Sequence, residues 1–317
     1  MRYIGIHAQQ IRNNTLSIVL LSLFPCLVVV LVFLFFYLIA YLQYGGQPES
    51  PDLWTPAFLN TRMVMPWVLG GVLLWFIIAY FSHAAIIRKT TGSRPLQRKG
   101  NMRVYNLVEN LCMSKGMQMP KINIIEDDSL NAFASGIDSS TYTVSLSRGI
   151  IRELSDEELE TVIAHELAHI RHRDVRLLIV SIVFVGIFAM LTNLSIRILF
   201  RSGSRRSNKN AGAIILIFLM VVAIGYFFAT LMRFAISRKR EYLADAAAAE
   251  MTRRPEALVG ALRKISSDPD IEAVTRDDVA QLFIEHPRKK AALFSGFRSL
   301  FATHPPIEKR IAVLEQF

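Results

Sequence analysis

The chain has 317 residues, of which 52% are apolar, and its mean hydropathy is positive. This composition excludes an ordinary soluble globule and favours a protein with membrane spans. The formal net charge is +10. In a membrane protein, this excess of Lys and Arg indicates anchoring beside anionic lipid, and no module of arginines and aromatics indicates a nucleic-acid partner.

Four apolar runs indicate membrane helices. They cover residues 16–42, 63–81, 177–196 and 211–232, and each is close to the ~20 residues that cross a bilayer. The first run is too long for a signal-peptide core and lacks a small-residue cleavage site, so we expect it to be retained. The chain is therefore predicted to be a mainly α integral membrane protein with four transmembrane helices.

Basic residues set the expected orientation. The linker 43–62 holds one basic residue, whereas the segment after the second run holds Arg88, Lys89, Arg94, Arg98 and Lys99. The positive-inside rule places the linker outside and residues 82–176 in the cytoplasm. The loop 201–210 is basic, yet must be outside if the last two runs both span. Either it translocates despite its charge, or the pair forms a hairpin that does not cross fully.

This organisation divides the chain into four parts. Residues 1–87 form an N-terminal membrane region with two spans, and residues 177–236 form a membrane hairpin. The polar regions 88–176 and 237–317 each look incomplete alone. We expect them to pack as one cytoplasmic α+β domain that the hairpin interrupts.

The first polar region carries a helix and three short β runs. Residues 102–115 have helical amphipathicity and are followed by Gly116 and Pro120. Turn residues separate the β runs at 121–126, 131–135 and 141–147, which predict a small antiparallel sheet. A helical turn is expected at residues 149–154.

The next helix carries an HExxH sequence. Ser155 and Glu158 form a capping box at its start. His165 and His169 lie one turn apart on one helix face and can hold one metal ion, while Glu166 can reach a water on that metal. This is the minimum apparatus for zinc-assisted hydrolysis of an amide bond. The alternative is a helix with two ordinary histidines, but the apolar flanks favour a metal because buried polar groups need partners.

A catalytic zinc needs a third protein ligand. His172 is seven residues beyond His165, a rise of about 10.5 Å on a straight helix, which is too far for one ion. Asp174 points elsewhere at helical spacing. Glu241 and Asp245 share a helix face, so one can ligate while the other accepts a hydrogen bond from a ligating histidine. Alternatively, Glu241 is a solvated charge beside Arg238–Arg240.

Four motifs in order carry a family resemblance. They are Asn131–Ala134, His165–His169 with Arg173-Asp174, Ser237–Asp245, and His304–Arg310. With the order and number of spans, they resemble the HtpX-type membrane metalloproteases, a gluzincin family that also contains the CAAX prenyl endopeptidases. The resemblance covers nearly the whole chain.

The resemblance implies one zinc ion per chain, held by His165, His169 and Glu241. Glu166 would be the general base, which takes a proton from the zinc-bound water and later protonates the leaving amine. Asp245 would orient His165. The cytoplasmic domain would be a gluzincin-like protease domain.

Two further segments have implied roles. An edge strand that pairs with substrate backbone would comprise Asn131, Ala132, Phe133 and Ala134. His304 and Arg310 would lie near the active site and could stabilise the oxyanion. Alternatively, a Pro-Pro turn caps the last helix and Arg310 lies on its solvated face.

The leading hypothesis is a membrane-embedded zinc endopeptidase of a bacterial inner membrane, with its active site facing the cytoplasm. The resemblance implies polypeptide substrates, namely misfolded or damaged membrane proteins. One alternative is a prenyl-peptide endopeptidase, whose known members have about seven spans around a large chamber. Another is a non-catalytic membrane scaffold with a structural zinc, against which the intact Glu166 argues.

Overall fold

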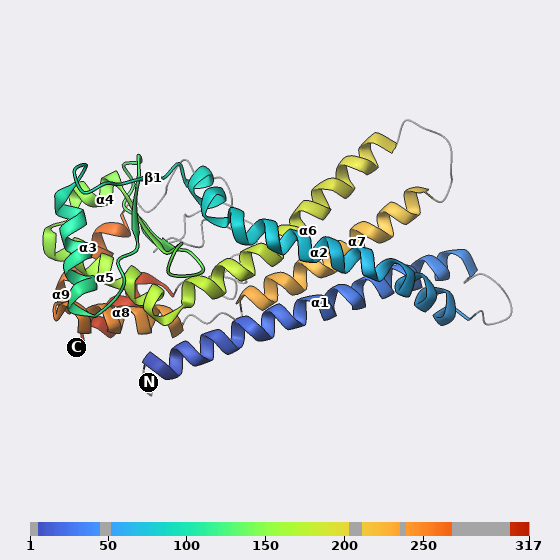
Figure 1. Cartoon of the computed structure of the whole chain (residues 1–317), viewed down its shortest axis with the longest axis horizontal. Helices are drawn as coiled ribbons and strands as arrows, with labels where there is room; N and C mark the ends of the chain where they lie inside the picture. The colour runs from blue at the N-terminus through green and yellow to red at the C-terminus, as the bar shows by residue number, and fades with distance from the viewer. Residues whose placement is uncertain (1–5, 45–51, 203–210, 235–238, 268–304, 317) are drawn as a thin grey trace. The chain divides into compact units, whose positions relative to one another are not determined.

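A computed structural model describes residues 6–44, 52–202, 211–234, 239–267 and 305–316 (Figure 1). The chain divides into two compact units. One comprises Met1–Leu16, Ser82–Ile179 and Phe234–Phe317, and the other comprises Ser17–Phe81 and Val180–Arg233.

Four long apolar helices account for the second unit. They are α1 (Ile6–Tyr44), α2 (Trp54–Thr91), α6 (Asp174–Ser202) and α7 (Ala211–Phe234). All four are long and apolar enough to cross a membrane. The predicted four spans are therefore confirmed by length and composition, and the ends of α1, α2 and α6 extend into the first unit.

Helix α2 begins earlier than the sequence predicted, so part of the expected linker 43–62 is helical. Asp52 caps the helix, because its Oδ1 accepts the backbone N–H groups of Trp54 at 2.9 Å and Thr55 at 3.1 Å. Pro56 is tolerated in the first turn, where its missing N–H needs no partner. The helix ends at Thr91, and Gly92 follows with φ +64°, the left-handed conformation that commonly closes a helix.

Aromatic side chains join the helices of the second unit. The ring of Phe24 on α1 stacks on Phe184 of α6, with centroids 4.3 Å apart, and meets Phe76 of α2 edge-on at 5.6 Å. A Cβ at Gly225 of α7 would lie 2.3 Å from the ring of Phe188. The absent side chain therefore allows α7 to approach α6 closely.

The first unit contains a four-stranded sheet, with strand order β1 (Arg94–Pro95), β2 (Lys121–Ile125), β4 (Thr143–Ser147), β3 (Ala132–Ser135). β3 and β4 form an antiparallel pair, as predicted, but β2 and β4 are parallel. The sheet is mixed because the chain passes from β2 to the far edge, makes β3, and returns through β4 beside β2. β3 is consequently an edge strand.

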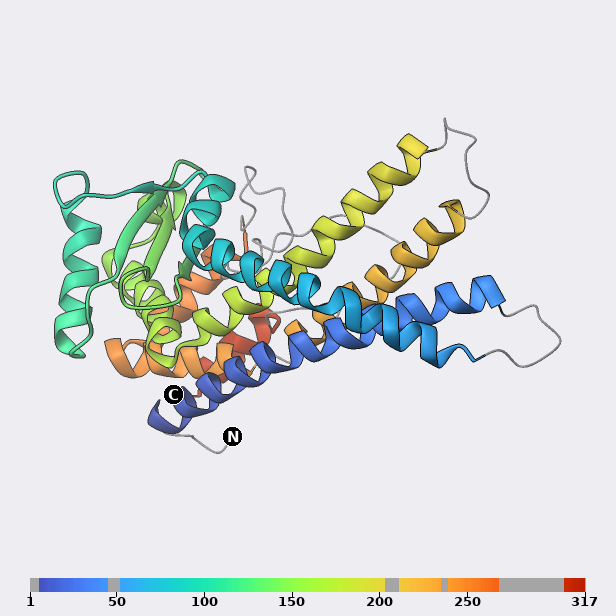
Figure 2. The same ribbon diagram turned by 45° about the vertical axis from the view of Figure 1, so that its right-hand side comes forward.

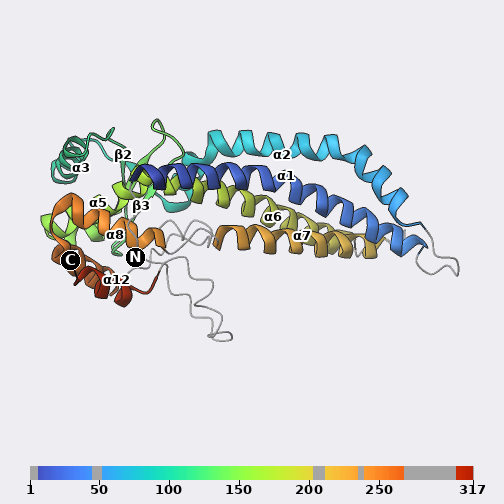
Figure 3. The ribbon, with the colours of Figure 1, turned by 90° about the horizontal axis from the view of Figure 1, so that it is seen from below.

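Among its described residues, six further helices belong to this unit. They are α3 (Met102–Ser114), α4 (Arg148–Glu153), α5 (Asp156–His172), α8 (Lys239–Thr252), α9 (Pro255–Ile265) and α12 (Ile307–Leu314). Helix α5 is central, since it contacts α3, β3, α8 and α9 (Figure 2). Helix α12 packs on α8 and α9 (Figure 3). The segments before and after the hairpin thus contribute to one packed core, which places α5 beside α8.

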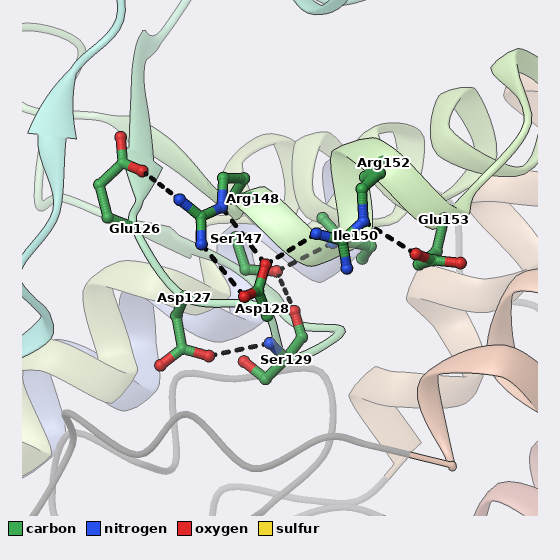
Figure 4. Close-up of polar contacts among 9 residues, drawn as sticks. All are labelled: Glu126, Asp127, Asp128, Ser129, Ser147, Arg148, Ile150, Arg152 and Glu153. Atoms are coloured by element: carbon green, nitrogen blue, oxygen red, sulfur yellow. Dashed lines mark hydrogen bonds and ion pairs between the residues drawn. The ribbon is translucent and has the colours of Figure 1, made fainter.

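Polar contacts fasten the turn after β2 to α4 (Figure 4). The carboxylate of Asp128 accepts hydrogen bonds from Arg148 at 3.1 Å and Arg152 at 2.9 Å. Ser147 caps α4 and donates its hydroxyl to the carbonyl of Ser129 at 2.6 Å. The exposed ion pairs add little stability. Their geometric effect is to hold the start of β3 beside the end of β4.

Gly149, in the first turn of α4, lies close to the backbone of the turn after β2 and provides a test of this packing. A Cβ at this position would lie 1.9 Å from the carbonyl oxygen of Asp128, so Gly149→Ala must displace backbone. We expect a loss of at least about 2 kcal/mol, because overpacking against backbone cannot be relieved by a rotamer change. Thermal unfolding of the detergent-solubilised protein measures this effect. Gly212→Ala is the control, since its Cβ would have no neighbour within 4 Å; an equal change in both variants would contradict the account.

Candidate metal centre

Helix α5 presents the three residues of the HExxH sequence. The predicted capping box is confirmed, with the Ser155 hydroxyl and the Glu158 carboxylate each bonding the other residue's backbone N–H. One turn apart, the Nε2 atoms of His165 and His169 are 3.1 Å from each other. His165 and Glu166 are buried, while His169 is partly exposed. The helix thus directs two imidazole nitrogens at one point that solvent can reach.

Helix α8 supplies the third candidate ligand. The carboxylate of Glu241 lies 3.7 Å from Nε2 of His165 and 3.6 Å from Nε2 of His169. One ligand atom from each of the three residues lies within 4.8 Å of the others. Glu241 is buried, so the alternative of a solvated helix charge is wrong.

The three residues fit a zinc ion. Two imidazoles and one carboxylate are a common catalytic zinc donor set, and ligands about 2.05 Å from a tetrahedral zinc are about 3.3 Å apart. The observed separations of 3.1, 3.6 and 3.7 Å lie close to this value. The cluster is therefore consistent with a metal site that needs little rearrangement.

A buried ion pair between Asp245 and Arg310 contacts Nδ1 of His165, the ring nitrogen that faces away from the metal cluster. Asp245 Oδ1 lies 3.0 Å from His165 Nδ1. Arg310 of α12 donates to both oxygens of Asp245, from Nε at 2.8 Å and from Nη2 at 2.6 Å, and its Nη1 is 3.8 Å from Glu241. Arg310 is 1% exposed, so the alternative that placed it on a solvated helix face is wrong. Its guanidinium compensates the carboxylates of Glu241 and Asp245.

The pKa values show how charge is balanced here. Burial raises the pKa of Asp245, but the charge and hydrogen bonds of Arg310 outweigh burial and lower the pKa to about 2. Burial lowers the pKa of His165, but Asp245 and Glu241 outweigh burial and raise the pKa to about 9. Without a metal, Asp245 and Glu241 thus favour the protonated, positively charged form of the His165 imidazole.

A carboxylate also contacts Nδ1 of His169, and the sequence did not predict this contact. Asp174 Oδ2 lies 3.2 Å from His169 Nδ1. A continuous helix would point Asp174 elsewhere, but α5 ends at His172, and the C-cap residue Arg173 that follows has a φ of +60°. Basic residues in the last helical turn are the signal that could have predicted this end. Arg240 completes the contact, because its Nη1 donates to the carbonyl of Asp174 at 3.2 Å.

Glu166 lies against the edge strand. Burial raises its pKa, and the charges of His165 and His169 act in the opposite direction. The backbone N–H of Ala134 on β3 bonds the Glu166 carboxylate, a smaller effect that lowers the pKa. The predicted Asn131–Ala134 segment thus reaches the proposed base. Within it, Ala132, Phe133 and Ala134 belong to β3, whereas Asn131 precedes the strand and its Oδ1 accepts the Ala132 N–H at 2.9 Å.

Two other histidines were considered in the sequence. His172 is buried outside the cluster, and burial lowers its pKa to about 4, in agreement with its exclusion as a ligand. His304 lies outside the described residues.

The chain combines four candidate membrane helices with an HExxH helix whose histidines meet a glutamate from a distant helix. These are the features of a membrane metallopeptidase. The model of peptidase family M48 matches residues 98–317. The chain is 63% identical over 325 residues to a protease HtpX homolog of Bacteroides fragilis, covering 100% of both chains. It is 38% identical over 247 residues to a protease HtpX homolog of Dictyoglomus thermophilum, covering 77% of this chain and 80% of that protein. The chain belongs to peptidase family M48.

The expected resemblance to HtpX-type metalloproteases is therefore confirmed, and the chain is a protease homolog with polypeptide substrates. Among solved structures, Ste24p of S. mikatae matches with a TM-score of 0.44 and 19% identity, over 89% of this chain and 61% of that chain.

Asp174 provides a test of whether the carboxylates that contact the Nδ1 atoms of His165 and His169 strengthen metal binding. Asp174→Ala removes the group that orients the His169 ring, and loss of such a partner typically costs about 10–100-fold in metal affinity. Asp174→Asn keeps a hydrogen-bond acceptor and should lose less. Competition with a chromophoric chelator measures the zinc Kd. Glu250→Gln, on the exposed part of α8, should leave Kd unchanged; an unchanged Kd in Asp174→Ala would remove Asp174 from the site.

Proposed function

We propose that His165, His169 and Glu241 bind one Zn²⁺ per chain and that the chain is a zinc-dependent endopeptidase. The observation that carries the proposal is the convergence of these three side chains beside the buried Glu166. Bound zinc would polarise the scissile carbonyl and make a water acidic enough to attack it. Side chains and backbone of the chain itself would transfer the proton, bind the substrate and position the ligands.

Glu166 acts as the proton carrier. Its carboxylate takes a proton from the attacking water and delivers it to the nitrogen of the leaving amine. Burial raises the pKa of Glu166, which brings the group closer to neutral pH and suits it to accept and then release a proton. A closed structural zinc site would need no such base, which supports an enzyme over a scaffold.

The edge strand β3 binds the substrate backbone. Among the described residues it pairs with β4 alone, so no described strand occupies the edge at which an extended peptide could add. The N–H of Ala134 points toward Glu166, so a peptide along this edge would pass the metal cluster. Main-chain pairing requires no particular side chain, which suits a protease for damaged proteins of varied sequence.

Arg310 acts as a positioning residue. Two of its nitrogens bond Asp245, and its third nitrogen, Nη1, lies 3.8 Å from Glu241. Because Arg310 contacts both carboxylates, we infer that it positions Asp245 and Glu241. The family resemblance had suggested instead that it stabilises the oxyanion.

We further propose a location in a bacterial inner membrane, with the centre on the cytoplasmic side and misfolded membrane proteins as substrates. Four candidate spans and the centre occur in one chain. The basic residues after the second span support the cytoplasmic orientation. The role in protein quality control rests on the similarity to HtpX-type proteases.

Glu166→Gln tests the mechanism. The amide keeps nearly the same shape but cannot accept the proton, so zinc content should be unchanged while casein cleavage falls at least about 100-fold. Mass spectrometry gives the metal content of the same preparations. Glu157→Gln, on the exposed face of α5, is the matched control and should cleave at the wild-type rate. Cleavage by Glu166→Gln at the wild-type rate would refute the proposed base.

A labelling experiment tests the orientation. In a variant with Cys26 and Cys112 replaced by Ser, a single cysteine at Lys99 should resist a membrane-impermeant maleimide in intact spheroplasts and react after lysis. A cysteine at Gln47, in the linker between the first two spans, should react in both. Reaction of the Lys99 cysteine in intact spheroplasts would reverse the proposed topology.

A further inference from the structure

A cavity away from the metal centre lies in the unit that holds the sheet. Its volume is about 580 Å³, and it is lined by the end of α2, the segment from β1 to α3, and strands β2, β3 and β4. None of the candidate metal ligands lines it. The cavity therefore has its own chemistry, separate from the metal centre.

The lining is basic. Arg88, Arg98 and Lys121 line the cavity, and none of the other described residues that line it is Asp or Glu. Arg98 is paired with Glu109 at 3.1 Å and lies over the ring of Tyr105. In the described part of the chain, no carboxylate lies within 4.0 Å of Arg88 or Lys121. The described residues thus leave two positive charges without a carboxylate partner, which indicates an anionic ligand.

Strand register places hydroxyl groups beside Lys121. Lys121 pairs with Thr143, and Thr143 pairs with Ser135, so the three side chains form a row on one face of the sheet. Ser135 and Thr143 both line the cavity, and the Thr143 hydroxyl donates to the carbonyl of Thr141 at 3.0 Å. Cations next to the hydroxyl of Ser135 suit the oxygens of a phosphate group.

The cavity lies at the end of a membrane-length helix. Ala84, Ile87 and Arg88 contribute to it from the last turns of α2, which is a candidate span. Arg88 is seven residues past the apolar run that ends at Phe81, a rise of about 10 Å. The headgroup layer begins where the hydrocarbon core ends and is several ångströms thick. Helical side chains tilt toward the N-terminus, which for Arg88 is the direction of the apolar run, so its long side chain can bring the guanidinium back to the level of the lipid phosphates.

We propose that this cavity binds the phosphate group of an anionic phospholipid. Arg88 and Lys121 supply the charge, and the hydroxyl of Ser135 supplies a hydrogen bond. Apolar residues of the lining, including Ile87 and Leu96, pack against the glycerol and the first acyl carbons. The bound lipid joins the end of α2 to the sheet whose edge strand lies beside Glu166.

Ligand titrations of purified full-length protein in neutral detergent test the proposal. The probes are dihexanoyl phosphatidylglycerol, dihexanoyl phosphatidylcholine and inorganic phosphate. Phosphatidylglycerol should bind at least about tenfold more tightly than phosphatidylcholine, and Arg88→Gln/Lys121→Gln should weaken its binding about tenfold or more. The same variant should keep wild-type zinc content and casein cleavage, which shows that it is folded.

Lys89→Gln/Arg94→Gln is the matched control. It removes the same charge from the same helix end and strand β1, but neither residue lines the cavity. Its Kd for phosphatidylglycerol should change less than about twofold. Equal loss in both double variants would show diffuse surface attraction and overturn the proposal, as would equal binding of the two lipids. Inorganic phosphate that binds as tightly as phosphatidylglycerol, and loses affinity in Arg88→Gln/Lys121→Gln, would replace the lipid with a soluble phosphate.

Discussion

The packing of α8 against α5 is the constraint on which the rest of the site depends. It buries Glu241 and Asp245 against two histidines, and buried carboxylates are costly unless they are paired. Glu241 and Asp245 are four residues apart, so both point toward α5 from one face. One meets the Nε2 atoms of the histidine pair, and the other meets Nδ1 of His165. The interface is therefore both a structural contact and the framework of the metal centre.

Arg310 makes that interface possible. It comes from α12, which is distant in sequence from α5, and it compensates negative charge that would otherwise be buried. A metal ion at the three candidate ligands would supply the remaining positive charge. The arrangement on the other histidine is similar, because Asp174 backs His169 and Arg240 contacts Asp174. Each candidate ligand histidine is thus oriented by a carboxylate that an arginine contacts.

Local signals in the sequence predicted much of this structure. The capping box, the three β runs and the helix at residues 102–115 depend on neighbouring residues, and they were placed within two residues of their observed ends. The HExxH pair is equally local, since one helical turn determines it. Glu241 was found by combining a helical spacing with a family resemblance.

Other features depend on long-range packing and could not be predicted. The parallel β2–β4 pair follows from the route of the chain around β3. The burial of Arg310 depends on where α12 packs, since its own helix pattern also permits an exposed position. Asp174 was missed because Arg173 adopts a left-handed conformation in which glycine is far commoner. The cap by Asp52 extended α2 into a segment whose prolines and glycines indicated a linker.

We propose that α5 and α8 together provide the three protein ligands of one metal ion. X-ray absorption spectroscopy of the zinc-loaded full-length protein tests it most directly, with Glu241→Ala as the comparison. The account predicts two imidazole nitrogens and a carboxylate oxygen from the protein, and loss of the carboxylate and most of the zinc in the variant. Three imidazole ligands, or the same spectrum and zinc content in Glu241→Ala, would contradict it.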